Sequence, residues 1–280
     1  MYKIGLYERE ITAFLGNSLS GYFNLRLASG VKDKTYAKAV VIDDGKTTYC
    51  AVAVDACWVS DELIKRVGEK VFEYTGIKKE NITVSATHSH TAGPGDTNEP
   101  DADKALESAY IEFLYNAVAD TVICAYQKRE NATIKLSTAE IKGSTFSRNY
   151  LMKDGSYKTN PGVLNPNILH SIGEIDPIAP VLFIENEKGE NMGMVYSCGN
   201  HQDSVDGTEI SGDWASVVSE KMKDKFGRNF ISVMFYGTAG NINQVDTSSK
   251  DKKIEYFLSC YKDLGKAVYE GIIKSLENQK

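Results

Sequence analysis

The sequence predicts an α/β protein in which mixed β-sheets are flanked by helices, arranged as a layered sandwich of two similar halves with an αββα-like order. Short apolar runs typical of buried strands alternate with segments of helical periodicity. The same order of elements occurs twice, within about 1–143 and about 177–280. Polar segments follow the strands, where α/β proteins usually gather their chemistry. We therefore expect residues 1–280 to form a single domain built from two similar halves.

In the first half, a predicted hairpin is followed by a helix and a third strand. The turn of the hairpin is Asp44-Gly45, a two-residue turn signal. Apolar residues at helical spacing predict the helix, and short apolar runs predict the strands. The predicted elements are strands over 39–42 and 49–54, a helix over about 61–74 and a strand over 82–86.

The second half repeats this order around the turn Glu187-Lys188-Gly189. Between the halves, 144–180 is the least regular stretch and is rich in Asn, Pro and Gly. Its apolar residues predict that it packs on the rest of the molecule and is not a flexible tether. The predicted elements of the second half are strands over 181–184 and 192–197, a helix over about 213–226 and a strand over 231–235.

Composition excludes several classes of function. The net charge of −6 leaves no basic stripe for a nucleic-acid surface. The sequence has neither an N-terminal signal segment nor a run of about 18 apolar residues, so we expect no integral membrane segment. The five cysteines show no paired spacing, which suits free thiols in a reducing cytosol. We therefore expect a cytoplasmic protein, and the sequence leaves its oligomeric state open.

Three of the four histidines follow predicted strands. His88 and His90 come directly after the strand 82–86, and residues two apart in extended backbone point to the same face. His201 follows a strand of the second half, and the repeat places it in the same cleft. Neutral imidazole is the commonest protein ligand for zinc. The sequence therefore predicts a metal or catalytic site at these three residues, whereas His170 is interpreted as structural.

Two aspartates, a turn and a cysteine are further candidates for this site. Asp55 could ligate the metal, orient a ligand imidazole or cap the next helix. Asp213 could cap the helix that begins there or act as a ligand. The turn 237–243, which contains Gly240, could present backbone amides to an oxyanion. Cys57 is interpreted as a small packing residue, with a catalytic thiol as the alternative.

Several short motifs spread over nearly the whole sequence occur together. The most specific is Thr87-His88-Ser89-His90-Thr91-Ala92-Gly93-Pro94-Gly95, which is similar to THTHSGPGG. The others are Ile4-Gly5 with Glu10-Ile11-Thr12, Gly21-Tyr22, Tyr36-Ala37-Lys38-Ala39, Ser147-Arg148-Asn149, Asn160-Pro161 and Asn200-His201. In these motifs the chain resembles the N-terminal domain of neutral (non-lysosomal) ceramidases and their short bacterial relatives.

The resemblance implies hydrolysis of an amide bond, that of ceramide in this family, with one zinc ion. It implies that the first His of the His-x-His motif, His88, and the later His201 bind that ion. It also implies that His90 contacts the substrate or the attacking group, and that Arg148 binds the substrate or the developing oxyanion. The candidate substrate-binding residues are Gly93, Asn149 and Asn241.

Two features differ from the family pattern. Asn243 stands where the family has its proposed serine nucleophile, and asparagine cannot attack a carbonyl. The family's remaining metal ligands, a Glu and a Tyr, come from a region beyond this segment. Asp55 and Asp213 are therefore the first candidates to complete the metal site. The other possibility is an incomplete site that has lost its activity.

We therefore predict a zinc-dependent hydrolase with one divalent ion, which cleaves an amide or related acyl bond through a metal-activated water. His90 or an acidic neighbour takes the proton, and Arg148 with turn amides near Gly240 stabilises the oxyanion. Asn243 is counted with them as a catalytic candidate. The expected substrate is a small-molecule or lipid-like amide. The alternatives are a non-catalytic ligand-binding protein on the same scaffold and a thiol enzyme based on Cys57.

Overall fold

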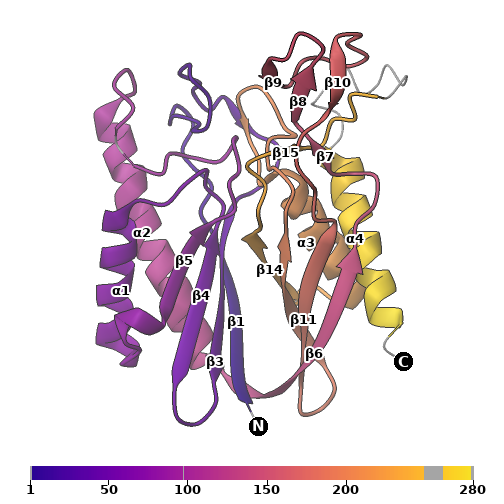
Figure 1. Ribbon diagram of the computed structural model, residues 1–280. Coiled ribbons are helices and arrows are strands. Elements are labelled where there is room, and N and C mark those ends of the chain that lie inside the picture. The colour runs from indigo at the N-terminus through magenta and orange to yellow at the C-terminus, as the bar shows by residue number, and fades with distance from the viewer. Residues whose placement is uncertain (1, 97, 249–260, 279–280) are drawn as a thin grey trace.

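The computed structural model describes residues 2–96, 98–248 and 261–278. In this part of the chain, eight strands form one mixed sheet with the order β14-β12-β11-β6-β1-β3-β4-β5. The sheet folds over between β1 and β6 into two packed layers. Helices α1 and α2 cover the outside of one layer, and α3 and α4 cover the outside of the other (Figure 1). This arrangement is the αββα-like sandwich of two similar halves that the sequence predicts.

The first layer comes from the N-terminal half of the chain. β1 and β3 are antiparallel, β3 and β4 form a hairpin, and β5 adds in parallel to β4. Helix α1 begins after Ser60, whose hydroxyl accepts a hydrogen bond from the amide of Leu63, as an N-cap residue does. The elements are β1 (Tyr2–Glu10), β3 (Tyr36–Asp43), β4 (Thr48–Val54), α1 (Asp61–Thr75), β5 (Ile82–Ala86) and α2 (Lys104–Gln127).

The second layer repeats the pairing of the first. β6 and β11 are antiparallel, β11 and β12 form a hairpin, and β14 adds in parallel to β12. The predicted helix over 213–226 coincides with α3. The elements are β6 (Glu130–Glu140), β11 (Ile178–Asn186), β12 (Asn191–Cys198), α3 (Asp213–Phe226), β14 (Ile231–Tyr236) and α4 (Tyr261–Glu277).

Three apolar clusters hold the four layers together. One lies between the first layer and its helices, and a second lies between the second layer and its helices. The third fills the space between the two layers, so each sheet layer is apolar on both faces. The buried members of this interlayer core are Ile4, Leu6, Val40, Ala53, Ala132, Ile184 and Val233.

Four long elements were not among the predicted ones: β1, α2, β6 and α4. In β1, a Cβ on Gly5 would lie 1.9 Å from the carbonyl oxygen of Ala125 in α2. Glycine makes this close approach possible, and it also weakens the apolar pattern of the strand. Helix α2 packs against both α1 and the sheet. Because α2 carries buried residues around much of its circumference, no single apolar face signals it.

The irregular stretch between the halves folds into a small three-stranded sheet with the order β10-β8-β9. It lies at the end of the sandwich where β11 begins, at the top of Figure 1. A short pair, β7 (Phe146–Ser147) with β15 (Ile242–Asn243), ties it to the turn after β14. Its strands are β8 (Asn149–Met152), β9 (Tyr157–Thr159) and β10 (Ile168–Ser171).

A second short pair joins the two halves: β2 (Gly30–Val31) runs parallel to β13 (Glu209–Ile210). A single 3-10 turn, η1 (Lys79–Asn81), leads into β5. No helix in the described part of the chain is long and apolar enough to cross a bilayer.

Candidate functional site

The three strand-end histidines lie together at one end of the sandwich. His88 and His90 follow β5, and His201 follows β12, at the carboxyl ends of these strands. The amide of His90 donates to the carbonyl of Gln202 over 3.0 Å, and the Gln202 side chain donates back to the carbonyl of Thr87. Segments more than 100 residues apart are therefore bonded to one another directly.

The three imidazole rings form a nearly equilateral triangle. Their ring centroids are 4.8 Å apart for His88 and His90, 4.9 Å for His88 and His201, and 5.0 Å for His90 and His201. Nε2 of His90 lies 3.3 Å from Nε2 of His88 and 3.1 Å from Nε2 of His201. The Nε2 atom of His90 thus lies between those of the other two rings.

The backbone of the His-x-His segment is not extended, as the sequence argument assumed. His88 has a φ of 69°, in the left-handed region that non-glycine residues rarely occupy. The amide of His88 donates to the carbonyl of Ala56 over 2.9 Å, which helps hold this turn. Such strained positions are concentrated at functional sites. His88 and His90 therefore meet through a turn, and not through the alternation of a strand.

Backbone carbonyls fix the orientation of two rings. Nδ1 of His88 lies 2.8 Å from the carbonyl oxygen of Cys57, and Nδ1 of His201 lies 3.4 Å from that of Ala239. A carbonyl oxygen only accepts hydrogen bonds, so each Nδ1 carries the hydrogen. The neutral ring then has a bare Nε2, which is the form that binds a metal.

Two of the three rings, His90 and His201, are kept neutral by their surroundings. Burial, together with the neighbouring imidazoles, lowers the pKa of His90 to about 3. Burial and His88 lower the pKa of His201 to about 4. A neutral imidazole is a metal ligand, whereas an imidazolium is not. His90 and His201 are therefore in the form in which an imidazole can bind a metal.

The spacing of the nitrogens fits a zinc ion. Zinc–nitrogen bonds of about 2.0–2.1 Å in a tetrahedral site put the ligand nitrogens about 3.3–3.4 Å apart. The separations of 3.3 and 3.1 Å between the Nε2 atoms are close to this value. Among the residues that the structure describes, two groups have ligand atoms within 4.8 Å of one another: Cys57 with His88 and His90, and His90 with His201 and Asp203.

The two aspartates proposed as ligands lie outside both groups. The carboxylate of Asp55 accepts from the amide of Tyr36 and the hydroxyl of Thr87, at 2.8 and 3.1 Å. It therefore anchors the residue before His88. The carboxylate of Asp213 accepts from the amides of Ser204 and Val205 at 2.7 and 3.0 Å, and from the amide of Trp214. Each aspartate is used to hold the backbone near a histidine.

The structure places Arg148 beside the histidines. Its positive charge lowers the pKa of both His90 and His201. The Arg148 side chain is half-buried, and its guanidinium makes no ion pair or hydrogen bond with the part of the chain that the structure describes. A cation in this position is available to an anionic or polarised ligand.

The candidates from the β7–β15 region form the wall next to Arg148. The carbonyl of Asn241 accepts from the amide of Arg148 at 2.9 Å, and Asn149 accepts a hydrogen bond from Thr159. Asn243 is buried and uses both ends of its amide: Nδ2 donates to Asn160 at 2.6 Å, and Oδ1 accepts from the amide of Val245. Gly240 is exposed, with open space where a Cβ would lie.

Two further candidates are Gly93, which follows the His-x-His segment, and Cys57, which adjoins His88. A Cβ on Gly93 would lie 2.6 Å from Cβ of Ala13, so this glycine serves close packing. Sγ of Cys57 lies 3.8 Å from Nδ1 of His88. Burial raises the pKa of the Cys57 thiol to about 12, which disfavours a thiolate nucleophile.

Sequence reasoning missed three residues that contact the imidazoles. The hydroxyl of Tyr236, the last residue of β14, lies 3.3 Å from Nδ1 of His201. Asp203 lies 3.8 Å from Nδ1 of His90 and accepts a 2.5 Å hydrogen bond from the hydroxyl of Tyr22. Tyr236 could have been found from its place at a strand end. Tyr22 was marked only as part of the motif Gly21-Tyr22, and nothing local in the sequence indicated that it reaches His90 and Asp203.

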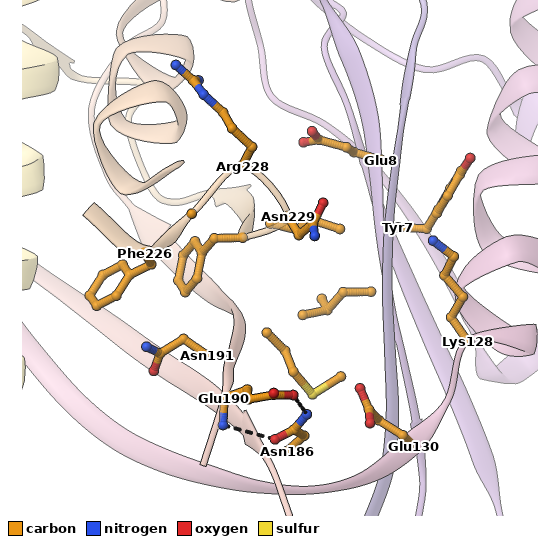
Figure 2. Close-up of a pocket in the computed structure, with 15 residues that line it drawn as sticks. Tyr7, Glu8, Lys128, Glu130, Asn186, Glu190, Asn191, Phe226, Arg228 and Asn229 are labelled. Carbon is orange, nitrogen blue, oxygen red and sulfur yellow. Dashed lines mark hydrogen bonds between the residues drawn. The ribbon is translucent and has the colours of Figure 1, made fainter. Parts of the chain in front are cut away.

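A large cavity lies elsewhere, at the amino ends of β12 and β14. It has a volume of about 720 Å³, and none of the three histidines lines it. Figure 2 shows charged side chains around it, among them Glu8, Lys128, Glu130 and Arg228. Its walls combine charges of both signs with an apolar floor. The histidine cluster is therefore independent of this cavity.

The chain matches one protein family by sequence and ceramidase structures by fold. Residues 2–252 match the family described as neutral/alkaline non-lysosomal ceramidase, N-terminal. The neutral ceramidase from Pseudomonas aeruginosa is 18% identical, with a TM-score of 0.80 over 99% of this chain and 45% of that chain. A structure described as a ceramidase complexed with C2 gives the same identity and TM-score, over 44% of its length. The chain thus spans less than half the length of these proteins, and at this identity the likeness shows the fold.

Proposed function

Because the chain belongs to the neutral/alkaline non-lysosomal ceramidase family through its match to the N-terminal domain, we propose that it is a metal-dependent hydrolase of an amide or related acyl bond. The observation that carries this proposal is the close approach of three imidazoles at the strand ends, with Nε2 of His90 within 3.3 Å of Nε2 of His88 and 3.1 Å of Nε2 of His201. The ceramidases of similar fold support a ceramide-like N-acyl substrate. The histidine cluster supplies the chemistry for this class of reaction.

His88 and His201 would hold a divalent ion, with Zn²⁺ as the first choice. When bound, such an ion polarises a carbonyl oxygen and lowers the pKa of a water toward about 7. The chain contributes two rings whose bare Nε2 atoms are oriented by the carbonyls of Cys57 and Ala239. A hydrogen bond from Nδ1 to a carbonyl sets the tautomer and the ring orientation of a ligand imidazole.

The attacking group in this proposal is water, because the chain offers no serine at the family position. Asn243 is buried, and both ends of its amide make structural hydrogen bonds. It therefore shapes the wall of the site. The proton of the water passes to a group beside the imidazoles, either His90 or its acidic neighbour Asp203.

Arg148 is the group that we assign to the developing oxyanion. Its charge acts on the same rings that surround the reaction centre, and the described residues leave its guanidinium without an ion pair. The carbonyl of Asn241 holds the backbone amide of Arg148, which fixes the start of this side chain. The exposed turn at Gly240 adds backbone amides nearby.

The surroundings of the cluster support a substrate with an apolar acyl chain. Tyr22, whose ring centroid is 5.7 Å from that of His90, is followed by Phe23, which is fully exposed. Trp58, 42% exposed, follows Cys57 directly. Exposed aromatic side chains next to a polar centre suit an N-acyl amide better than a wholly polar compound.

A non-catalytic binding protein is the second candidate function, and one observation favours it. At the serine position of the family, Asn243 makes structural hydrogen bonds with Asn160 and Val245. In this second reading, the same imidazoles and Arg148 would bind an amide without cleaving it. Metal content and turnover of an N-acyl amide separate the two functions.

The test is the metal content of the purified protein. We expect about one divalent ion per chain, lost in His88→Ala and in His201→Ala. His170→Ala is the matched control, because His170 is exposed on β10 and belongs to neither group of possible ligands among the described residues. Retention of metal in both cluster variants would contradict the metal centre. Full metal content without hydrolysis of N-acyl amides would favour the binding protein.

A further inference from the structure

We propose that Lys38 is a covalent binding site, whose amine forms a reversible imine with a small neutral aldehyde in the cavity between β3 and α3. Lys38 belongs to β3 in the first half of the chain, and α3 belongs to the second half. His88, His90 and His201 do not line this cavity. The inference therefore goes beyond the proposed hydrolase and does not depend on it.

The cavity is small and has charged walls. Its volume is about 310 Å³, which is at the lower end of the range for small-molecule sites, so it suits a small ligand. Two amines and three carboxylates line it, together with hydroxyl groups of β3 and α3. The charged residues are Lys34, Lys38, Asp33, Asp55 and Glu220.

Lys38 lacks the partners that a buried ammonium group ordinarily has. The residue is 8% exposed, and its Nζ donates a hydrogen bond to the hydroxyl of Ser219 over 2.9 Å. With the part of the chain that the structure describes, it makes no ion pair and no second hydrogen bond. Burying a charge without a paired partner is costly, so this environment favours the neutral amine. A neutral amine is the nucleophilic form of lysine.

The charged groups that face Lys38 come from β1, the end of β4 and α3. Asp55, Glu8 and Glu220 favour its charged form, whereas Lys223 opposes it. Glu8 is already paired with Lys223 over 2.6 Å. Burial is the largest influence, and it lowers the pKa of Lys38 below the ordinary value of a lysine.

A second amine lies on the same aromatic ring. Nζ of Lys38 is 5.5 Å from the centroid of the Tyr36 ring, and Nζ of Lys223 is 5.3 Å from it. Desolvation and a neighbouring cation are the two means by which proteins activate a lysine as a nucleophile. Lys38 has both, and it lines a cavity that a reactant can occupy.

The reaction needs only the amine and the aldehyde. Nζ forms a bond to the carbonyl carbon, and the carbonyl oxygen leaves as water with the two hydrogens of the amine. The hydroxyl of Ser219 accepts a hydrogen from Nζ and can donate its own to the departing oxygen. The step requires no oxidant, reductant or metal, and water reverses it.

The walls of the cavity select an uncharged compound. The carboxylates of Asp33, Asp55 and Glu220 repel an aldehyde that carries a carboxylate or a phosphate. The positive charge of Lys34 does not offset them, because it is paired with Glu10 over 2.7 Å. We therefore assign the site to short neutral aldehydes, of which acetaldehyde is the probe.

Reductive alkylation of the unaltered chain tests the proposal. Acetaldehyde forms the imine, cyanoborohydride reduces it to a stable ethylamine, and mass spectrometry of peptides locates the product. Lys34 is the internal control, because it lines the same cavity but its side chain is 60% exposed. At about pH 7 an ordinary lysine is almost wholly protonated, so we expect Lys38 to react at least about tenfold faster. An equal or slower rate at Lys38 in the folded chain would overturn the proposal.

The pH profile separates an activated amine from a merely accessible one. Between about pH 6 and pH 8 the rate at Lys34 should rise about tenfold per pH unit, because its neutral fraction does. The rate at Lys38 should rise less steeply, and its advantage should disappear in urea, where both side chains are solvated. A parallel rise at the two lysines of the folded chain would show that Lys38 is a structural ammonium, which would also overturn the proposal.

Discussion

The role of Arg148 can be tested directly by substitution. Its guanidinium lies near His90 and His201, and the described residues offer it no ion pair. A cation held in this way is free to act on charge that develops on a substrate. Its contribution should therefore be larger in the transition state than in the bound substrate.

Replacing Arg148 with Ala should lower kcat for an N-acyl amide by about 10²–10³, because one oxyanion donor is worth that much in rate. The metal content should not change. Arg66→Ala is a control at a cation that pairs with Glu112 on the outer helices. An unchanged kcat, or a rise in KM alone, would show that Arg148 contributes only binding.

At the same scale, sequence reasoning found residues that are close together in the chain or that carry a motif. His88, His90 and His201 were singled out because histidine is rare in this chain and all three follow strands. The supporting contacts were not accessible in this way. Tyr22 reaches Asp203 across 181 positions of the sequence, and no local pattern marks such a pair.

At the scale of the elements, the close packing of β1 against α2 depends on one glycine, Gly5. The space between them is so small that a Cβ on Gly5 would lie 1.9 Å from the carbonyl of Ala125. Backbone cannot move away from such an overlap as a flexible side chain can. The helix must therefore shift away from the strand, or the strand must bend.

Gly5→Ala should reduce the free energy of unfolding by at least about 1–3 kcal/mol, the usual cost of overpacking a core. Urea denaturation measures it. Gly68→Ala in α1 is the matched control, because its Cβ would make only an ordinary 3.5 Å contact with Lys79. Alanine favours a helix by up to about 1 kcal/mol, so this variant should be equal or more stable. Equal stability of both variants would refute the close approach.

The predicted elements are those whose periodicity is simple. The helix over 213–226 shows an apolar face, and the strand over 181–184 is a short apolar run. Helix α2 was not recognised because it buries residues on several faces. Helical periodicity reveals a helix only when the helix has one face in the core and another in solvent.

In the whole molecule, the interlayer core joins the two halves into one body. Ile184 from β11 packs there with residues of β1, β3 and β4, and it is fully buried. Neither layer could expose this face to water without losing apolar burial. We therefore propose that the chain unfolds as a single cooperative unit, as the expectation of one domain requires.

Ile184→Ala should lower the free energy of unfolding by about 2–5 kcal/mol. Native-state hydrogen exchange should show the same loss at the central amides of β3 and of β11, because one opening exposes both layers. Leu169→Ala is the control, since Leu169 is 57% exposed on β10. A loss confined to β11 would mean that the two halves unfold separately.

The sequence by itself determined the αββα class, the repeated order of elements, the family likeness and the three histidines as candidates. These features are local or periodic, so they can be traced in the order of residues. Only the tertiary structure decided that the three imidazole rings lie against one another, that Asp55 and Asp213 hold backbone near the cluster, and that Asp203 and Tyr22 lie beside His90. The physical reason is that a ligand set depends on ångström-scale distances between remote segments, which are fixed by the packing of the two layers.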